Sequence, residues 1–115
     1  MIMELTGKCL QDFKQFCLLN NSFRPDRDGD LYSEVFGDYV FNMPKNMLYG
    51  VYEDYFDSVG VYIQIETRLF DHEHPVYIDF KRDYKRVGIY KKRPEARDAA
   101  IEKANEIRNA YLESI

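Results

Sequence analysis

Apolar residues recur every three or four positions in three stretches of the chain, and this spacing indicates amphipathic helices. The stretches are residues 6–20, 44–58 and 94–115. Thr6 suits the N-cap of the first helix, and Pro44 suits the first turn of the second, where its missing N–H group needs no partner. The pattern predicts a helical front end and a long C-terminal helix.

The segment between the first two helices has a mixed pattern. Residues 23–30 have the composition of a loop, since they are rich in Asp and contain Pro25 and Gly29. Residues 31–43 carry apolar pairs about four positions apart, which favours a helix, but Gly37 and many aromatic and β-branched residues argue against one. Helix and irregular structure both stay open for residues 31–43.

In the middle of the chain the period changes from four to two. Apolar and polar side chains alternate over residues 59–70, which predicts a β-strand. The sequence then predicts a turn at residues 71–75, a second alternating strand at 76–80, a turn at 83–86 and a short third strand at 87–90. Strands joined by such short connections pair as an antiparallel meander.

This order of elements predicts a single α+β domain over residues 1–115. One face of the meander must be covered by helices, and the two terminal helices are the expected cover. The expected core face consists of Val61, Ile63, Ile65, Val76, Ile78, Phe80, Val87 and Ile89, and the expected outer face of Tyr62, Gln64, Glu66, Arg68, Tyr77, Asp79, Lys81 and Tyr90.

The composition suits a chain that folds around its own core. Of its 115 residues 45% are hydrophobic and 16% aromatic, and the net charge is −4. A nucleic-acid-binding protein usually has a clear basic excess, which this chain as a whole lacks. Cys9 and Cys17 lie about 12 Å apart along the predicted first helix, too far for a disulfide. They are expected to be buried thiols in a reducing compartment.

No apolar run in the sequence is long enough to span a membrane. The first residues also lack the basic and then apolar order of a signal peptide. We therefore expect a cytoplasmic location and no membrane partner.

Two stretches resemble a family of small uncharacterised proteins from prophages and mobile elements of gut bacteria. They are residues 47–63 (MLYGVYEDYFDSVGVYI) and 93–107 (RPEARDAAIEKANEI). This resemblance implies a phage or mobile-element setting and no particular chemistry. More loosely, three strands followed by a helix that opens at Glu95 and Ala96 resemble the AP2-type DNA-binding domain and the double-stranded-RNA-binding domain. That likeness of shape implies nucleic acid as an alternative partner.

Cations are concentrated in residues 81–93, where Asp83 is the only acid. Tyr84 and Tyr90 lie between the cations, so this segment could stack on bases while it neutralises phosphates. The same composition also suits a solvated hairpin whose charges protect an edge strand from mispairing. The cations are Lys81, Arg82, Lys85, Arg86, Lys91, Lys92 and Arg93.

Acids are concentrated between Asp26 and Asp57, where the only cations are Arg27 and Lys45. Such a surface could imitate the phosphates of DNA, meet the basic segment of a second copy, or be an ordinary solvated surface. The sequence leaves these three interpretations open.

Two short motifs raise the question of a metal. Residues 26–30 have alternate acids, but an EF-hand loop fits them in neither register. His72 and His74 flank Glu73 and would share a face if this segment were extended, as in a zinc- or nickel-like site, but no third ligand has the required spacing. We predict no metal and no cofactor.

Motifs of catalysis are absent from the sequence: there is no nucleophile elbow, phosphate-binding glycine loop, HExxH or Cys–His arrangement. We therefore expect no catalytic residue. The prediction is a non-catalytic interaction module that binds another protein or its own copy, since exposed tyrosines supply large contact area at low entropic cost. The alternative is nucleic-acid binding through residues 81–93. Candidate interaction residues are Tyr62, Arg68, Tyr77, Lys81, Lys85, Arg86, Tyr90, Lys91, Lys92 and Arg93.

Overall fold

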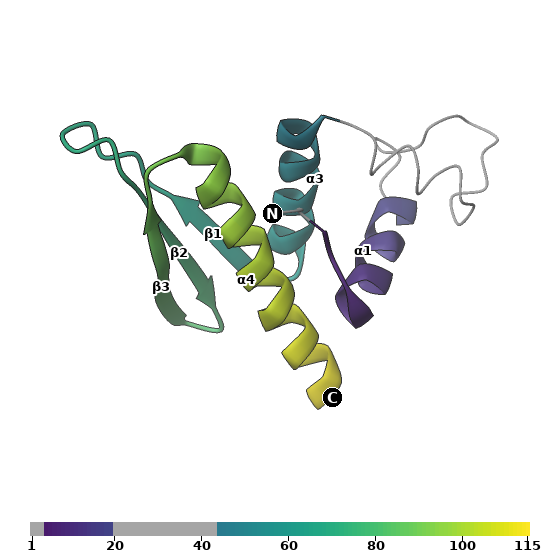
Figure 1. Cartoon of the computed structure of the whole chain (residues 1–115). Coiled ribbons are helices and arrows are strands. Elements are labelled where there is room, and N and C mark those ends of the chain that lie inside the picture. Colours follow the sequence, from purple (N-terminus) through teal and green to yellow (C-terminus); the bar gives the residue numbers. More distant parts are fainter. Residues whose placement is uncertain (1–3, 20–43) are drawn as a thin grey trace.

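The computed structural model describes residues 4–19 and 44–115 and has the predicted α+β class (Figure 1). Its three strands form one antiparallel sheet in the order β1-β2-β3, as predicted. The predictions for residues 23–30 and 31–43 lie outside the described residues. The elements are α1 Gly7–Leu19, α3 Lys45–Ser58, β1 Val61–Ile65, β2 His74–Phe80, β3 Asp83–Tyr90 and α4 Arg93–Ser114.

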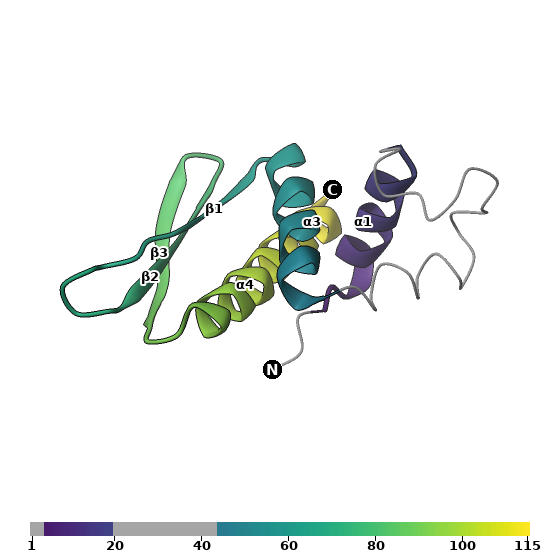
Figure 2. The same ribbon diagram turned by 90° about the horizontal axis from the view of Figure 1, so that it is seen from above.

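The elements lie in layers, with the sheet at one end and α1 at the other (Figure 1, Figure 2). Helix α4 packs across all three strands, α3 packs against β1, and α1 packs on α3 and α4. The expectation that both terminal helices cover the sheet is therefore wrong for α1. Its apolar stripe contacts the aromatic side of α3 instead.

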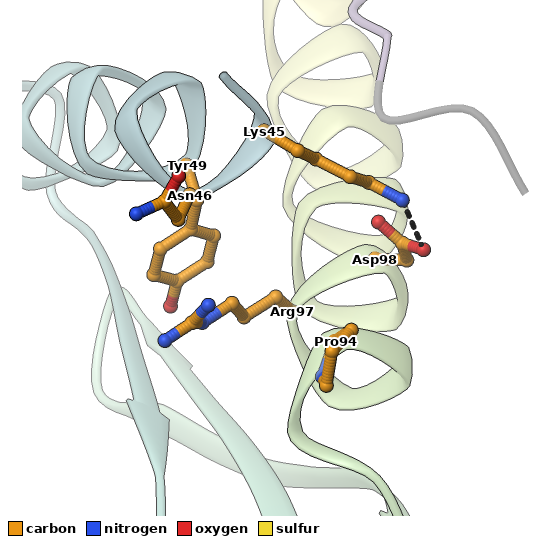
Figure 3. Close-up of a pocket in the computed structure, with 6 residues that line it drawn as sticks. All are labelled: Lys45, Asn46, Tyr49, Pro94, Arg97 and Asp98. Atoms are coloured by element: carbon orange, nitrogen blue, oxygen red, sulfur yellow. Dashed lines mark hydrogen bonds and ion pairs between the residues drawn. The ribbon is translucent and has the colours of Figure 1, made fainter.

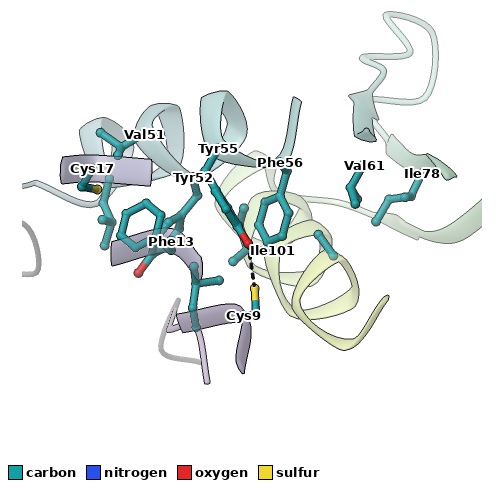
Figure 4. Close-up of a cluster of buried hydrophobic side chains, with 13 residues drawn as sticks. Cys9, Phe13, Cys17, Val51, Tyr52, Tyr55, Phe56, Val61, Ile78 and Ile101 are labelled. Carbon is teal, nitrogen blue, oxygen red and sulfur yellow. Dashed lines mark hydrogen bonds between the residues drawn. The ribbon is translucent and has the colours of Figure 1, made fainter. Parts of the chain in front are cut away.

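An aromatic cluster joins these three helices (Figure 4). The ring of Phe13 meets the rings of Tyr52 and Tyr55 edge-on, at centroid distances of 5.1 and 5.5 Å. Phe56 and Ile101 extend the cluster toward the sheet. Edge-to-face packing of this kind stabilises a core beyond the area that it buries.

The inner face of the sheet has the predicted register in its first two strands. Ile63 pairs with Ile78 and Ile65 with Val76, so these side chains share the face toward α4. The helix presents a stripe of small residues, four apart, that are fully buried: Ala96, Ala100 and Ala104. Because alanine is small, the helix backbone can approach the sheet closely.

Strand β1 ends at Ile65, well before the predicted end at residue 70. The chain then forms a loop closed by a bridge between Arg68 and Glu73, with Leu69 83% and Phe70 100% exposed at its tip. Helix α4 begins only at Arg93, so none of the described helices lies beneath this loop to bury an apolar side chain (Figure 1).

The second turn consists of Lys81 and Arg82 rather than residues 83–86, so β3 is twice as long as predicted. Both turn residues have positive φ, 52° and 66°. This is the backbone of a tight hairpin turn that usually takes Asn-Gly, so residue type alone did not reveal it.

A β-bulge in β3 overturns the predicted faces of its last residues. Val76 pairs with Gly88 but Tyr77 pairs with Arg86, which leaves Val87 as the extra residue. One extra residue moves the following side chains to the other face.

Ile89 is therefore 38% exposed, and Tyr90 packs on the inner face beside the first alanines of α4. The predictions that Ile89 belongs to the core and Tyr90 to the outer face are wrong. Gly88 permits the arrangement, since a Cβ atom there would lie 2.6 Å from the Tyr90 hydroxyl oxygen.

Candidate functional site

The outer face of the sheet, opposite α4, has no helix packed on it among the described residues (Figure 2). Side chains from all three strands meet on this face because the β1–β2 and β2–β3 pairings are both in register there. The outer face contains two rows of three residues, Tyr62–Asp79–Tyr84 and Gln64–Tyr77–Arg86.

Three tyrosines dominate the outer face. The rings of Tyr77 and Tyr84 are stacked, with centroids 5.3 Å apart and planes at 8°. Tyr62 and Tyr84 are 54% and 55% exposed. The Tyr84 hydroxyl also donates to Oε1 of Gln64 at 3.4 Å, which links β3 to β1 across the middle strand. The face is thus rich in aromatic rings that are partly exposed and already ordered.

The charges of the outer face are few and mixed. Asp79 lies in the row between Tyr62 and Tyr84, and Arg86 lies beside Tyr77. Glu66 is half-buried just beyond the end of β1. A face with so small a net charge neither attracts a polyanion nor repels a second copy of itself.

The cations of residues 81–93 do not form one surface. Arg86 lies on the outer face, whereas Lys85 pairs across from Ile78 on the other face and forms an ion pair with Asp83 at 3.1 Å. Lys81 turns toward α4, with Nζ 4.2 Å from the centroid of the Tyr111 ring. Alternation along a strand separates these charges onto both faces.

The remaining candidate cations lie at the other end of β3. Lys91 and Lys92 are exposed in the connection to α4, and Arg93 donates to the Thr67 hydroxyl at 3.2 Å. Arg68 lies in the loop after β1, 3.8 Å from Asp71. The structure thus brings Tyr62, Tyr77 and Arg86 together and separates the other candidates from them.

A groove of about 420 Å³ lies at the end of the sheet where β2 turns into β3. Tyr62 and Tyr111 contribute rings to it, and Lys81, Arg82 and Arg108 contribute cations. Arg108 is already engaged, because its guanidinium donates two hydrogen bonds to Oδ2 of Asp12 at 2.8 and 3.2 Å.

A second cavity, of about 180 Å³, lies between the first turns of α3 and α4 (Figure 3). Lys45 of α3 reaches Asp98 of α4, with Nζ 2.8 Å from Oδ2. The guanidinium of Arg97 lies over the Tyr49 ring, 5.5 Å from its centroid. Asn46 and Pro94 also line the cavity.

Tyr49 and Asp98 determine the polarity of this cavity. Burial and the neighbouring Glu53 carboxylate raise the pKa of Tyr49, so its hydroxyl stays protonated and donates to Glu53 at 2.9 Å. Asp98 is only 8% exposed, and its Oδ1 atom has no hydrogen-bond partner among residues 4–19 and 44–115. An unpartnered buried carboxylate oxygen is rare and needs an explanation.

Both cysteines are free thiols buried among the helices, as predicted. Burial raises the pKa of Cys9 to about 11 and that of Cys17 to about 12. Only the thiolate is a good nucleophile, so the packing of these residues favours a structural role.

The segment that contains the two histidines is not extended, as a metal site shared by both would require. His72 has a positive φ of 55° in the turn, and His74 contacts the Thr67 hydroxyl at 3.3 Å through Nδ1. Within residues 4–19 and 44–115, no three His, Cys, Asp or Glu side chains come together as a metal site. Most of the acidic stretch between Asp26 and Asp57 lies outside the described residues.

The chain matches no known family model, no curated protein and no solved structure. The resemblances to prophage proteins, to AP2-type domains and to double-stranded-RNA-binding domains therefore stay predictions. None of the helices in the described part of the chain is long and apolar enough to cross a lipid bilayer.

The cavity between α3 and α4 was not among the sites predicted from the sequence. One signal was present: Asp98 lies three positions before Ile101, on the row of α4 that faces the core. An acid in a buried row indicates a specific partner. Its partner Lys45 is 53 positions away, which no local pattern links to it.

Proposed function

We propose that the chain is a non-catalytic interaction module that binds a protein surface through the outer face of its sheet, with a second copy of the chain as the occupant. The observation that carries this proposal is the stacked Tyr77–Tyr84 pair beside the exposed Tyr62. Rings that are ordered before binding lose little entropy when a partner covers them.

The charge of the outer face supports a second copy. A two-fold symmetric interface must be complementary to itself, and a strongly charged face would repel its own image. Asp79 and Arg86 have opposite signs and lie on neighbouring strands of this face. Residues of one copy can therefore meet opposite charges of the other.

The proposal also includes a cytoplasmic location and a role in a phage or mobile element, and each is supported by a different observation. The buried free thiols of Cys9 and Cys17 are consistent with a cytoplasmic location. The resemblance of residues 47–63 and 93–107 to prophage proteins supports a role as an accessory protein of a phage or mobile element.

The test is the oligomeric state measured by analytical ultracentrifugation over a range of concentrations. The wild type is expected to dimerise, with an affinity that changes little between low and physiological salt. The double variant Tyr62→Ala, Tyr84→Ala should dimerise at least about tenfold more weakly, as for aromatic residues at the centre of an interface. Met47→Ala is the matched control, because Met47 is 57% exposed on α3, away from the outer face.

A wild type that stays monomeric at high concentration would contradict self-association. Photo-crosslinking from position 84 in cells, with position 47 as control, would then test for a different protein on the same face. Equal crosslinking from both positions would contradict the proposal that the outer face is the binding surface.

Nucleic-acid binding through residues 81–93 is the alternative outcome. It would be recognised by steep salt dependence, with a log–log slope of about −3 to −4 for four phosphate contacts. It would also be lost when Lys85, Arg86, Lys91 and Lys92 are all changed to Glu. We expect only weak binding, because Lys85 and Arg86 lie on opposite faces of β3, and Lys91 and Lys92 lie beyond its end.

A further inference from the structure

The cavity between α3 and α4 has the features of a ligand site that is separate from the outer face. It lies between two helices, on the side of α4 away from the open face of the sheet (Figure 1, Figure 3). Its volume of about 180 Å³ exceeds roughly tenfold what one water molecule needs. A small organic molecule therefore fits.

The buried Asp98 carboxylate requires a hydrogen-bond donor at this cavity. Lys45 occupies only its Oδ2 atom, at 2.8 Å. The Oδ1 atom is buried, has no partner in the described part of the chain, and turns toward the space between the helices, on the side of Tyr49 (Figure 3). A group with a hydroxyl or amide N–H would satisfy it.

The surroundings of Asp98 favour a ligand that is also an anion. Of the lining residues that the structure describes, Lys45 and Arg97 are cations and Asp98 is the one acid. The first turns of α3 and α4 both border the cavity, and helix N-termini carry partial positive charge. Neither N-cap residue, Pro44 or Lys92, forms a side-chain capping hydrogen bond. A cationic ligand would be repelled here, although it could donate to Asp98.

We propose that this cavity binds a small organic anion, a carboxylate or a phosphate ester, that has a hydroxyl group next to the charged group. The anion lies between Lys45 and Arg97, the hydroxyl donates to Oδ1 of Asp98, and Tyr49 and Pro94 flank the carbon atoms. The proposal does not depend on the oligomeric state of the chain.

The experiment uses two pairs of probes that differ in the hydroxyl group. Lactate is compared with propionate, and 2-hydroxyethyl phosphate with ethyl phosphate, by following the backbone amide signals of α3 and α4 in an NMR titration. One hydroxylated anion should bind about tenfold more tightly than its partner, as for a hydrogen bond to a charged group. The pair with the larger difference in affinity shows whether the site prefers a carboxylate or a phosphate ester.

Variants separate the two parts of the site. Asp98→Asn should remove the preference for the hydroxylated probe, because the amide offers a weaker, uncharged acceptor. Arg97→Gln should weaken both members of a pair by a similar factor. Lys103→Gln is the control, since Lys103 lies on the same helix but outside the lining, and it should leave all affinities unchanged.

Three results would overturn the proposal. The first is that no probe shifts the amide signals at the start of α3 and α4. The second is equal binding with and without the hydroxyl, which would leave Oδ1 of Asp98 unused. The third is an affinity that Arg97→Gln leaves unchanged. Because Arg97 is half-exposed at the cavity mouth, this variant stays informative even if Asp98→Asn fails to fold.

Discussion

Tyrosines occur in two clusters of this molecule, one buried and one exposed to solvent. Tyr52 and Tyr55 are 0% exposed in the helical core, whereas Tyr62 and Tyr84 are more than half exposed on the outer face of the sheet. Both clusters are ordered by ring contacts, edge-to-face between Phe13 and Tyr52 and parallel between Tyr77 and Tyr84.

The two clusters differ in the process that buries their apolar surface. In the core the apolar surface is buried when the chain folds, and this burial contributes to the stability of the chain. On the outer face the rings are ordered but still wet, so the same gain is available only when a partner covers them. The comparison predicts that core aromatics determine stability and outer tyrosines determine association.

The largest expected effect is on the core cluster. Phe13→Ala should lower the free energy of unfolding by about 3–5 kcal/mol, because it removes a buried ring and leaves a cavity. Urea denaturation measures it. Phe70→Ala, at a fully exposed phenylalanine, should change stability by less than about 0.5 kcal/mol. Similar values for the two variants would remove the distinction between the clusters.

A second pair of variants tests the β-bulge that separates the two faces. Ile78 is 2% exposed and Ile89 is 38% exposed. Ile78→Ala should cost about 2–5 kcal/mol, and Ile89→Ala less than about 1 kcal/mol. A larger loss at Ile89 than at Ile78 would mean that β3 has the uninterrupted alternation predicted from the sequence.

The buried thiols predict a loss of stability at alkaline pH. The folded pKa values of Cys9 and Cys17, about 11 and 12, are raised above the ordinary 9.0, so the folded state holds these protons more tightly. Their contribution is complete below about pH 9 and is lost as the pH rises through the folded values. Each group contributes at most about 1.4 kcal/mol per pH unit.

The matched variant for this prediction is Cys9→Ala, Cys17→Ala. Its unfolding free energy should fall less steeply than that of the wild type between pH 9 and 11. Parallel curves would show that the thiols ionise as easily in the fold as in the unfolded chain.

The smallest expected change in stability is at the outer tyrosines. Tyr84→Ala should lower the free energy of unfolding by less than about 1 kcal/mol, since it removes the stacking on Tyr77 and one long, exposed hydrogen bond to Gln64. Self-association should nevertheless weaken in the same variant. If Tyr84→Ala lowers the free energy of unfolding as much as Phe13→Ala does, the Tyr84 ring is buried in solution and the outer face is not an exposed surface.

Much of the fold could be predicted from local patterns. The period of the apolar residues predicted α1, α3 and α4 to within a residue or two, and alternation predicted the register of β1 against β2. These features depend on neighbours within a few positions, which the sequence displays directly. Of the candidate site, Tyr62 and Tyr77 were correctly assigned to the outer face for the same reason. Arg86 was predicted to lie in a turn, and the structure places it on the outer face within β3.

Features that depend on distant contacts could not be predicted in this way. Thr6 was the expected N-cap of α1, yet the Cys9 N–H group donates to Oδ1 of Asn109, on α4, at 2.8 Å. The burial of Asp98 likewise depends on Lys45, from a different helix. In both cases the partner is more than 50 positions away.

The sequence by itself determined the described helices, the order of the three strands and the α+β class, because side-chain periodicity is a local property of the backbone. The tertiary structure alone decided the faces of Ile89 and Tyr90, the separation of the basic residues and the cavity at Asp98. A single bulge reverses a face, and a cavity forms where two helix ends meet. The physical reason in each case is packing between segments that are distant in the chain, which periodicity does not encode.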